Sequence, residues 1–247
     1  MSVSSIQWQQ VLLADARKLL KEPFFWFIMV APVLLGWGCR YLLPYLDARF
    51  PGLELSAYYP VIVALLILTP PVYYGFVLAL LVLEEKDQGS LLAVAVTPIS
   101  LGSFLFARIA MFTLMSVPLI FVVHEIIGVV TISRPELFFV AVSASLSAPL
   151  VVMLLAAYCK NQLEGFVMGK GMGFLVLFPL AMFFVTDYWH VLCGVLPTYW
   201  PIIAYFTAAS TDGSEAFFYA AVVVGALFQT SAAYWLYQRF SRQLSLG

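Results

Sequence analysis

Charged residues are scarce in this sequence. They make up 10% of its 247 residues, against 63% hydrophobic residues, and the net charge is −1. A soluble domain carries roughly 25% charged residues, so this chain has too little polar surface to keep a globule in water. The composition excludes a soluble domain, and without an excess of positive charge it gives no indication of a nucleic-acid partner.

Cysteine is also rare, and its spacing argues against two kinds of site. Cys39, Cys159 and Cys193 are far apart and form no C-x-x-C pair. Neither a zinc site nor a redox motif is therefore indicated. We expect three free thiols that behave as small hydrophobic side chains.

Complete catalytic motifs are missing as well. His124 and Glu125 begin like the zinc-protease motif H-E-x-x-H, but the second histidine is absent. The segment from Gly165 to Lys170 is one residue too short for a phosphate-binding loop, and Gly171 stands where Ser or Thr would bind magnesium. We therefore expect that the chain is not an enzyme, with no catalytic residue, metal or cofactor of its own.

Long apolar stretches dominate the sequence instead. A membrane-spanning helix needs about 20 predominantly apolar residues, and the sequence predicts six such spans. They cover residues 24–43, 58–83, 101–130, 137–158, 166–185 and 217–237. The predicted fold is an all-α membrane protein, with one transmembrane domain over residues 1–247.

Two further segments have apolar character outside these spans. Residues 6–22 predict an amphipathic helix that lies in the headgroup region, with its cations toward anionic lipid. Residues 188–210 are too short to cross the membrane twice, and a single crossing would place the C-terminal cations outside. A re-entrant or interfacial segment on the outer side, between the fifth and sixth spans, satisfies both constraints.

Lysine and arginine gather on one side of this predicted topology. With the N-terminus inside, the outer side holds only Arg40, Arg49 and Arg134. The inner side holds the other nine: Arg17, Lys18, Lys21, Lys86, Arg108, Lys160, Lys170, Arg239 and Arg242. The positive-inside rule then predicts a multi-pass protein of the cell inner membrane with both termini in the cytoplasm.

Small residues recur every four positions at the start of the fifth span. Gly165, Gly169 and Gly173 form a small-xxx-small pattern, which lets two helices approach closely in lipid. The pattern fits a dimer face and packing within one subunit equally well.

Residues near the middle of the second span are candidates for a translocation pathway. Pro70 and Pro71 each remove a helical hydrogen bond, so we expect the helix to break there. The full candidate set consists of Thr69, Pro70, Pro71, Tyr73 and Tyr74 of the second span and Phe178 of the fifth span.

The connection after the second span is the most informative stretch. Glu84 and Glu85 close the span, and Gly89 and Ser90 form a turn and helix-start signal. A short apolar helix over residues 91–96 should follow and end before Pro98. Such a helix at the cytoplasmic face either contacts a partner or rests against the membrane.

This stretch resembles the membrane subunits of the type-two ABC exporter family. That family has a Glu-rich end of the second span, then Gly-Thr/Ser-Leu, then a short helix that ends in Thr-Pro-Ile/Leu-Ser/Arg. The matching positions here are Glu84, Glu85, Gly89, Ser90, Leu91, Thr97, Pro98, Ile99 and Ser100. The run from Leu196 to Pro201 looks like the family's outer re-entrant segment. Within the family, the chain looks most similar to fluoroquinolone-exporter-type permeases.

The resemblance implies a mechanism. Two permease subunits, identical or related, would form the translocation unit in the bilayer, and two separate ATPase subunits would bind ATP and magnesium below them. The short helix would couple ATP hydrolysis to export of a small amphipathic, drug-like or lipid-like substrate. The coupling residues would be Glu84, Glu85, Gly89, Ser90, Leu91, Leu92, Thr97 and Pro98. The family often has an arginine near the first glutamate, where this chain has Lys86.

One function of another class stays open. If the third span extends to Ile132, His124 and Glu125 lie near the membrane, and intramembrane ionisable residues often mark proton relays. An ion-coupled secondary transporter is therefore the alternative.

Overall fold

The computed structural model describes residues 23–91, 100–177, 193–210 and 213–245, and every element within them is helical. The long helices are α2 (Pro23–Arg49), α3 (Tyr59–Asp87), α5 (Leu101–Ile127) and α12 (Glu215–Ser245). The shorter elements are η1 (Pro51–Leu53), η2 (Leu55–Tyr58), α6 (Arg134–Ser145), α7 (Ser147–Tyr158), α8 (Gln162–Lys170), α9 (Gly173–Leu177) and α11 (Tyr199–Ala209). The all-α fold class is confirmed for the described residues.

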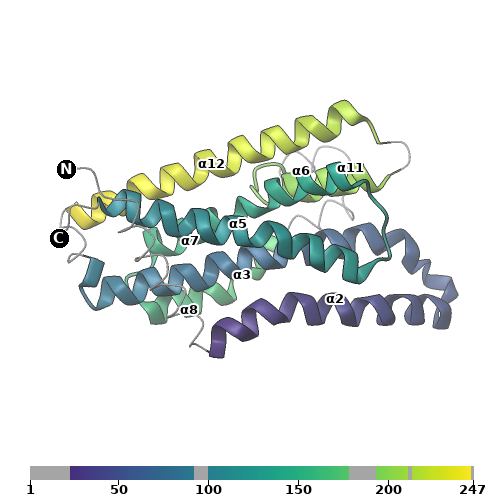
Figure 1. Ribbon diagram of the computed structural model, residues 1–247, viewed down its shortest axis with the longest axis horizontal. Helices are drawn as coiled ribbons and strands as arrows, with labels where there is room; N and C mark the ends of the chain where they lie inside the picture. The colour runs from purple at the N-terminus through teal and green to yellow at the C-terminus, as the bar shows by residue number, and fades with distance from the viewer. Residues whose placement is uncertain (1–22, 92–99, 178–192, 211–212, 246–247) are drawn as a thin grey trace.

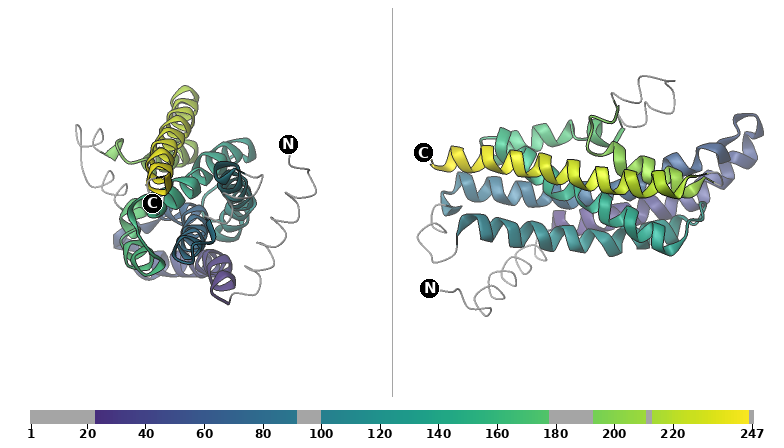
Figure 2. Two further views of the ribbon diagram at one scale, coloured as in Figure 1. Left: turned by 90° about the vertical axis from the view of Figure 1, so that its left-hand side faces the viewer. Right: turned by 90° about the horizontal axis from the view of Figure 1, so that it is seen from above.

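The long helices run side by side along the longest axis of the molecule (Figure 1). Helix α3 lies at the centre, where it packs against α2, α5, α6, α7, α8 and α11. Helix α12 lies on the other side of the bundle from α2 (Figure 1), where it packs on α7 and α11. The end-on view in Figure 2 shows the helices grouped around α3.

Local sequence signals explain where several helices begin and end. The Ser100 side chain accepts from the Ser103 backbone N–H at the start of α5, and Ser133 with Glu136 forms a capping box at the start of α6. The Asn161 side chain accepts from the Glu164 backbone N–H at the start of α8. Gly128 ends α5 with a positive φ of 60°, which glycine adopts without steric cost.

Five helical stretches among the described residues are long and apolar enough to cross a membrane. They are Trp26–Arg49, Leu55–Asp87, Leu101–Ile127, Arg134–Tyr158 and Glu215–Gln243. In the second and fourth, 67% of the apolar window is buried, compared with 22%, 28% and 33% in the other three. The second and fourth stretches therefore form the interior, and the others present most of their apolar surface outward, as expected for contact with lipid.

The expected fifth span differs from a continuous helix in its described part. Helix α8 ends at Lys170, and a turn at Gly171 and Met172 separates it from α9. Residues 178–185 of that span lie outside the described residues. Helix α8 begins at the end of the bundle that holds the C-terminus, and α11 lies at the other end (Figure 1).

Two other expectations about the helices are wrong, and a third lies outside the described residues. The third span ends at Ile127 rather than residue 130, because Gly128 terminates α5. The expected break at Pro70 and Pro71 is absent, since α3 continues through both. The fourth span is the interrupted one: α6 stops one residue before Leu146, and Pro149 has no N–H to bond the Ser145 carbonyl. The predicted helix over residues 6–22 lies outside the described residues.

The segment after residue 193 forms a short helix covered by protein. Helix α11 has 11 residues, about 16 Å at 1.5 Å per residue, and is too short to span a bilayer. It packs against α12, α6 and α3, with Tyr199, Ile202 and Tyr205 buried. The Trp200 indole N–H donates to the Gly194 carbonyl over 3.0 Å and holds the entry to the helix.

The closest approach of α3 to α7 generates a stability prediction. A Cβ on Gly75 would lie 2.6 Å from the backbone oxygen of Ala148 and 2.9 Å from the Val151 Cβ, so the helices would have to separate. We expect Gly75→Ala to lower the free energy of unfolding by about 1–3 kcal/mol, as overpacking of a tight interior does. Thermal unfolding in detergent measures this.

Gly38→Ala is the matched control for this substitution. Gly38 lies in helix α2, and a Cβ there would meet nothing within 4 Å. Its melting temperature should stay unchanged or rise slightly, because alanine favours helix. Equal melting temperatures for the two variants would show that the α3–α7 contact is not tight.

Candidate translocation and coupling site

A buried ion pair ties the end of α3 to α5. The Arg108 guanidinium donates to the Glu85 carboxylate over 2.7 Å, and the two side chains are only 2% and 16% exposed. The same guanidinium lies over the Phe104 ring, 4.9 Å from its centroid. A charge-assisted hydrogen bond in such a setting is strong and directional, so α3 and α5 are joined near the C-terminal end of α3.

The next two residues of α3 reach the opposite side. The Lys86 ammonium donates to the Cys159 carbonyl at the end of α7 over 3.2 Å and lies 5.7 Å from the Phe240 ring centroid of α12. The Asp87 carboxylate accepts from the Gln162 backbone N–H, the first residue of α8, over 3.0 Å. Three consecutive side chains therefore connect this end of α3 to α5, α7, α8 and α12.

The turn that follows is exposed. Gly89 has a positive φ of 69°, and the Ser90 hydroxyl donates to the Glu85 carbonyl over 3.0 Å. Gln88 donates to the Glu84 carboxylate over 3.1 Å. Gln88, Gly89 and Ser90 face outward at the end of the bundle where α12 also ends, so this turn is accessible to a partner (Figure 1).

Not all of the predicted coupling residues face outward. Leu91 is 2% exposed and belongs to the core with Tyr74, Phe112 and Phe240. Glu85 points toward Arg108 rather than a partner. Leu92, Thr97 and Pro98 lie outside the described residues. In the sequence Arg108 counts only as a cytoplasmic cation, and its pairing with Glu85 is visible only in the structure.

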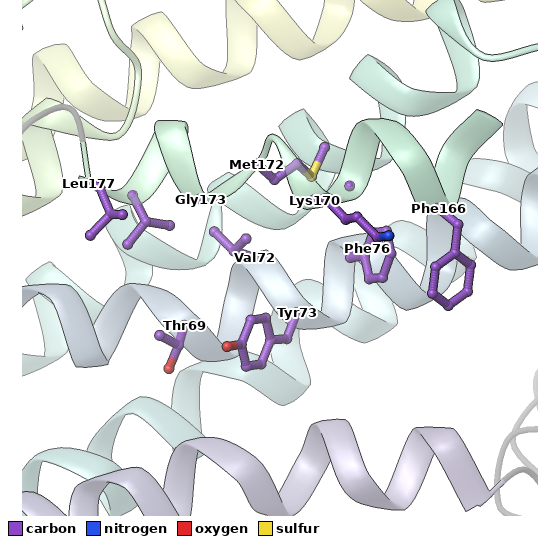
Figure 3. Close-up of a pocket in the computed structure, with 11 residues that line it drawn as sticks. Thr69, Val72, Tyr73, Phe76, Phe166, Lys170, Met172, Gly173 and Leu177 are labelled. Carbon is purple, nitrogen blue, oxygen red and sulfur yellow. The ribbon is translucent and has the colours of Figure 1, made fainter. Parts of the chain in front are cut away.

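A cavity of about 340 Å³ lies between α3 and the α8–α9 segment. Its walls are mostly apolar and aromatic, with Thr69, Tyr73 and Lys170 as the polar side chains, and Figure 3 shows them around the hollow. The remaining lining residues are Val72, Phe76, Phe166, Gly169, Met172, Gly173, Val176 and Leu177. Pockets of this composition suit amphipathic organic ligands.

The structure separates the candidate pathway residues into two groups. Thr69 and Tyr73 line the cavity. Pro70, Pro71 and Tyr74 are buried on the other sides of α3, with Tyr74 packed edge-to-face on Phe112, the ring centroids 6.1 Å apart. Phe178 lies outside the described residues.

The three glycines do not share one face. A Cβ on Gly165 would meet Leu83, and one on Gly169 would overlap the Phe76 ring, so both pack against α3 of the same chain. A Cβ on Gly173 would meet nothing within 4 Å. The first two glycines let α8 approach α3, and leucine at position 169 would disturb this contact before any contact with a second subunit.

His124 and Glu125 do not form a continuous relay. His124 is 6% exposed and packs edge-to-face on Tyr205, with centroids 5.8 Å apart, while Glu125 is exposed. Both lie in the last turn of α5, which ends at Ile127 and not at Ile132. The two side chains point to different environments, so nothing in the described residues connects them as a proton path.

Five helical stretches among the described residues that are long and apolar enough to cross a bilayer define a multi-pass membrane protein. A family model described as "Fluoroquinolones export permease protein Rv2686c-like" matches residues 15–237. Two Mycobacterium tuberculosis proteins, fluoroquinolones export permease protein Rv2686c (strain ATCC 25618 / H37Rv) and MT2760 (strain CDC 1551 / Oshkosh), are each 32% identical to this chain, with 97% of both chains covered. The chain belongs to this family of export permeases, which confirms the resemblance noted in the sequence.

The ion pair between Glu85 and Arg108 generates the second prediction. Glu85→Ala removes the carboxylate that accepts from the buried Arg108 guanidinium, and loss of one member of a buried ion pair costs about 3–5 kcal/mol. We expect a strong loss of folded protein, measured as the monodisperse fraction in detergent and its melting temperature.

Two companion variants sharpen this experiment. Glu85→Leu combined with Arg108→Met removes both charges and should recover most of the folded fraction, since apolar replacements of a buried pair are often tolerated. Glu125→Ala removes an exposed carboxylate from α5 and should change little. If Glu85→Ala behaves like Glu125→Ala, the ion pair does not hold the two helices together.

Proposed function

We propose that this chain is the membrane-spanning subunit of an ABC-type exporter that moves an amphipathic, drug-like or lipid-like molecule out of the cytoplasm. ATP and magnesium would bind to two copies of a separate ATPase subunit. The family and the printed names of the two relatives support export and suggest fluoroquinolones as one substrate class. The Gly-Ser-Leu to Thr-Pro-Ile-Ser motif of the sequence supports the ATPase partner.

The observation that carries this proposal is the arrangement at the end of α3. An exposed turn at Gly89 adjoins three side chains that hold α5, α7 and α8. A force applied to the turn by an ATPase would therefore reach helices on both sides of α3. Helix α8 also lines the cavity, so its displacement would change the space available to a substrate.

The same proposal includes the assembly and topology. Two permease subunits, as a homodimer or with a related chain, would form the translocation unit. The chain would cross the inner membrane six times with both termini in the cytoplasm, and α11 would be part of a re-entrant segment on the outer side. The position of α11 at the end of the bundle opposite the Gly89 turn supports this orientation (Figure 1).

The topology prediction is tested by cysteine labelling. Gly52→Cys should react with an impermeant maleimide added to intact cells or spheroplasts, and Gln88→Cys only after the membrane is opened. Both positions are exposed in the structure. Labelling of Gln88→Cys from the outside would invert the topology and contradict the proposal.

The native cysteines give a low background in this experiment. Cys159 and Cys193 are buried. Burial raises the pKa of the Cys159 thiol, Glu164 adds to this and Lys86 opposes it. The thiol therefore stays protonated at neutral pH and reacts slowly. Cys39 is partly exposed and is replaced by alanine.

The coupling prediction concerns the exposed turn. Gly89→Val forces a β-branched residue into a left-handed conformation, which costs about 1–2 kcal/mol and distorts the turn. We expect substrate-stimulated ATPase activity and export to fall several-fold while the amount of inserted protein stays constant. Gln88→Cys should also crosslink to the ATPase subunit in the complete complex.

Gly52→Val is the control for the turn. Gly52 lies in η1 at the other end of the bundle, and a Cβ there would meet nothing within 4 Å. Its export should match that of the wild type. Normal export by Gly89→Val, together with no crosslink from position 88, would contradict a coupling role for this turn.

A further inference from the structure

The end of α12 that holds the C-terminus carries a basic hollow. Arg239 and Arg242 lie in the last two turns of this helix, and both side chains are exposed. The hollow has a volume of about 300 Å³ and is lined by Trp235, Gln238, Arg239, Arg242 and Gln243. Tryptophan is enriched at the boundary between the bilayer core and water, and arginines near helix ends extend to the same level. The hollow therefore lies at the depth of the lipid head groups.

The Arg239 guanidinium is held in place by an aromatic ring of another helix. It lies over Tyr158, the last residue of α7, 4.5 Å from the ring centroid. Stacking uses the flat face of the guanidinium and leaves the N–H groups on its edge, where the described residues offer no hydrogen-bond or ion-pair partner. Nearby, the Gln243 amide donates to the Ala157 carbonyl over 3.0 Å. The cation is thus positioned before a ligand arrives, which lowers the entropic cost of binding.

The same tyrosine lines an apolar groove between the end of α7 and α8. The groove has a volume of about 350 Å³, and its other lining residues are Cys159, Leu163, Glu164, Val167 and Met168. Leu163 and Val167 are 76% and 63% exposed, and their spacing along the chain places them on one face of α8. Because α8 begins at the end of the bundle where α12 ends, the groove leads from the tyrosine toward the middle of the bundle (Figure 1).

Charge at this corner favours an anion. Lys160 is exposed in the turn between α7 and α8, and Glu164 is the acidic side chain of the groove. The Glu164 carboxylate already accepts from the Lys160 backbone N–H over 2.7 Å. In the proposed topology this end faces the cytoplasm, where the anionic leaflet attracts basic side chains and basic pockets between membrane helices bind phosphate head groups. Arginine suits this ligand because its planar fork donates two hydrogen bonds to a phosphate.

We propose that Arg239 binds the phosphate of an anionic phospholipid of the inner leaflet, with Arg242 beside it and one acyl chain in the groove along α8. The apolar groove favours a lipid over a soluble phosphate, because only a lipid fills both parts of the site. A lipid bound in this way bridges α12 and α8. Helix α8 also lines the cavity next to α3, so the lipid would influence that cavity. The inference rests on the proposed topology and not on the exported substrate.

The test counts lipids bound to the purified permease by native mass spectrometry. Phosphatidylglycerol and phosphatidylcholine with the same long acyl chains are titrated separately, so that only the head group differs. We expect phosphatidylglycerol to bind about 10-fold more tightly, because the choline cation cancels the phosphate charge of the other lipid. Arg239→Gln should reduce this preference about 5-fold, the size expected for one basic residue at an anionic surface. Arg239→Lys should reduce it less, because the charge remains.

Arg134→Gln is the matched control for the charge. Arg134 is an exposed arginine at the start of α6, remote in the chain from the hollow. Its loss removes the same charge from the protein and should leave the preference for phosphatidylglycerol unchanged.

A second comparison tests the groove and the source of the phosphate. Val167→Asn places a polar side chain in the groove at an exposed position, which the fold tolerates. It should weaken binding of long-chain phosphatidylglycerol and affect the short-chain dihexanoyl form less. Inorganic phosphate should not displace the long-chain lipid.

Other results overturn the inference in distinguishable ways. Equal binding of the two head groups, or a preference that survives Arg239→Gln, would show that Arg239 does not recognise the phosphate. Displacement by inorganic phosphate would identify a site for a free anion, and unchanged binding by Val167→Asn would place the acyl chains elsewhere. Each of these results leaves the export function standing, since the measurement needs neither the ATPase nor a substrate. Labelling of Gln88→Cys from the outside would instead refute the leaflet assigned to the lipid.

Discussion

The ion pair between Glu85 and Arg108 is the constraint around which the described helices are organised. A guanidinium that is almost fully buried needs a carboxylate at a fixed distance, and this fixes the register of α5 against α3. The adjacent Lys86 and Asp87 then hold the end of α7 and the start of α8. Because α3 is the central helix, the positions of its neighbours depend on this short stretch, and the turn at Gly89 follows it directly in the chain.

The sequence predicts the parts of this fold that depend on local composition. Apolar length identified five of the six expected spans among the described residues, and the turn at Gly89 follows from glycine's conformational freedom. What depends on contacts distant in the chain was not predictable. Arg108 pairs with a residue 23 positions earlier, and a count of cations cannot distinguish it from a solvated one.

The candidate site shows the same division. The glycine spacing predicts a close helix contact, but only the structure shows that Gly165 and Gly169 contact α3 and that Gly173 borders a cavity instead. The prolines also predict the wrong position for a helix break. Helix α3 continues through Pro70 and Pro71, whereas a break occurs near Pro149, where α6 and α7 meet. Neighbouring helices decide whether a proline interrupts a membrane helix, and one sequence does not contain that information.

The buried arginine of α5 also bears on how the protein is made. An arginine in a helix that enters the bilayer alone raises the free energy of insertion, by about 2.5–3.5 kcal/mol at the helix centre. Its carboxylate partner lies in the preceding long helix, so it leaves the ribosome first and is already available when α5 reaches the translocon. The order of synthesis thus lets α5 integrate against α3 as a hairpin.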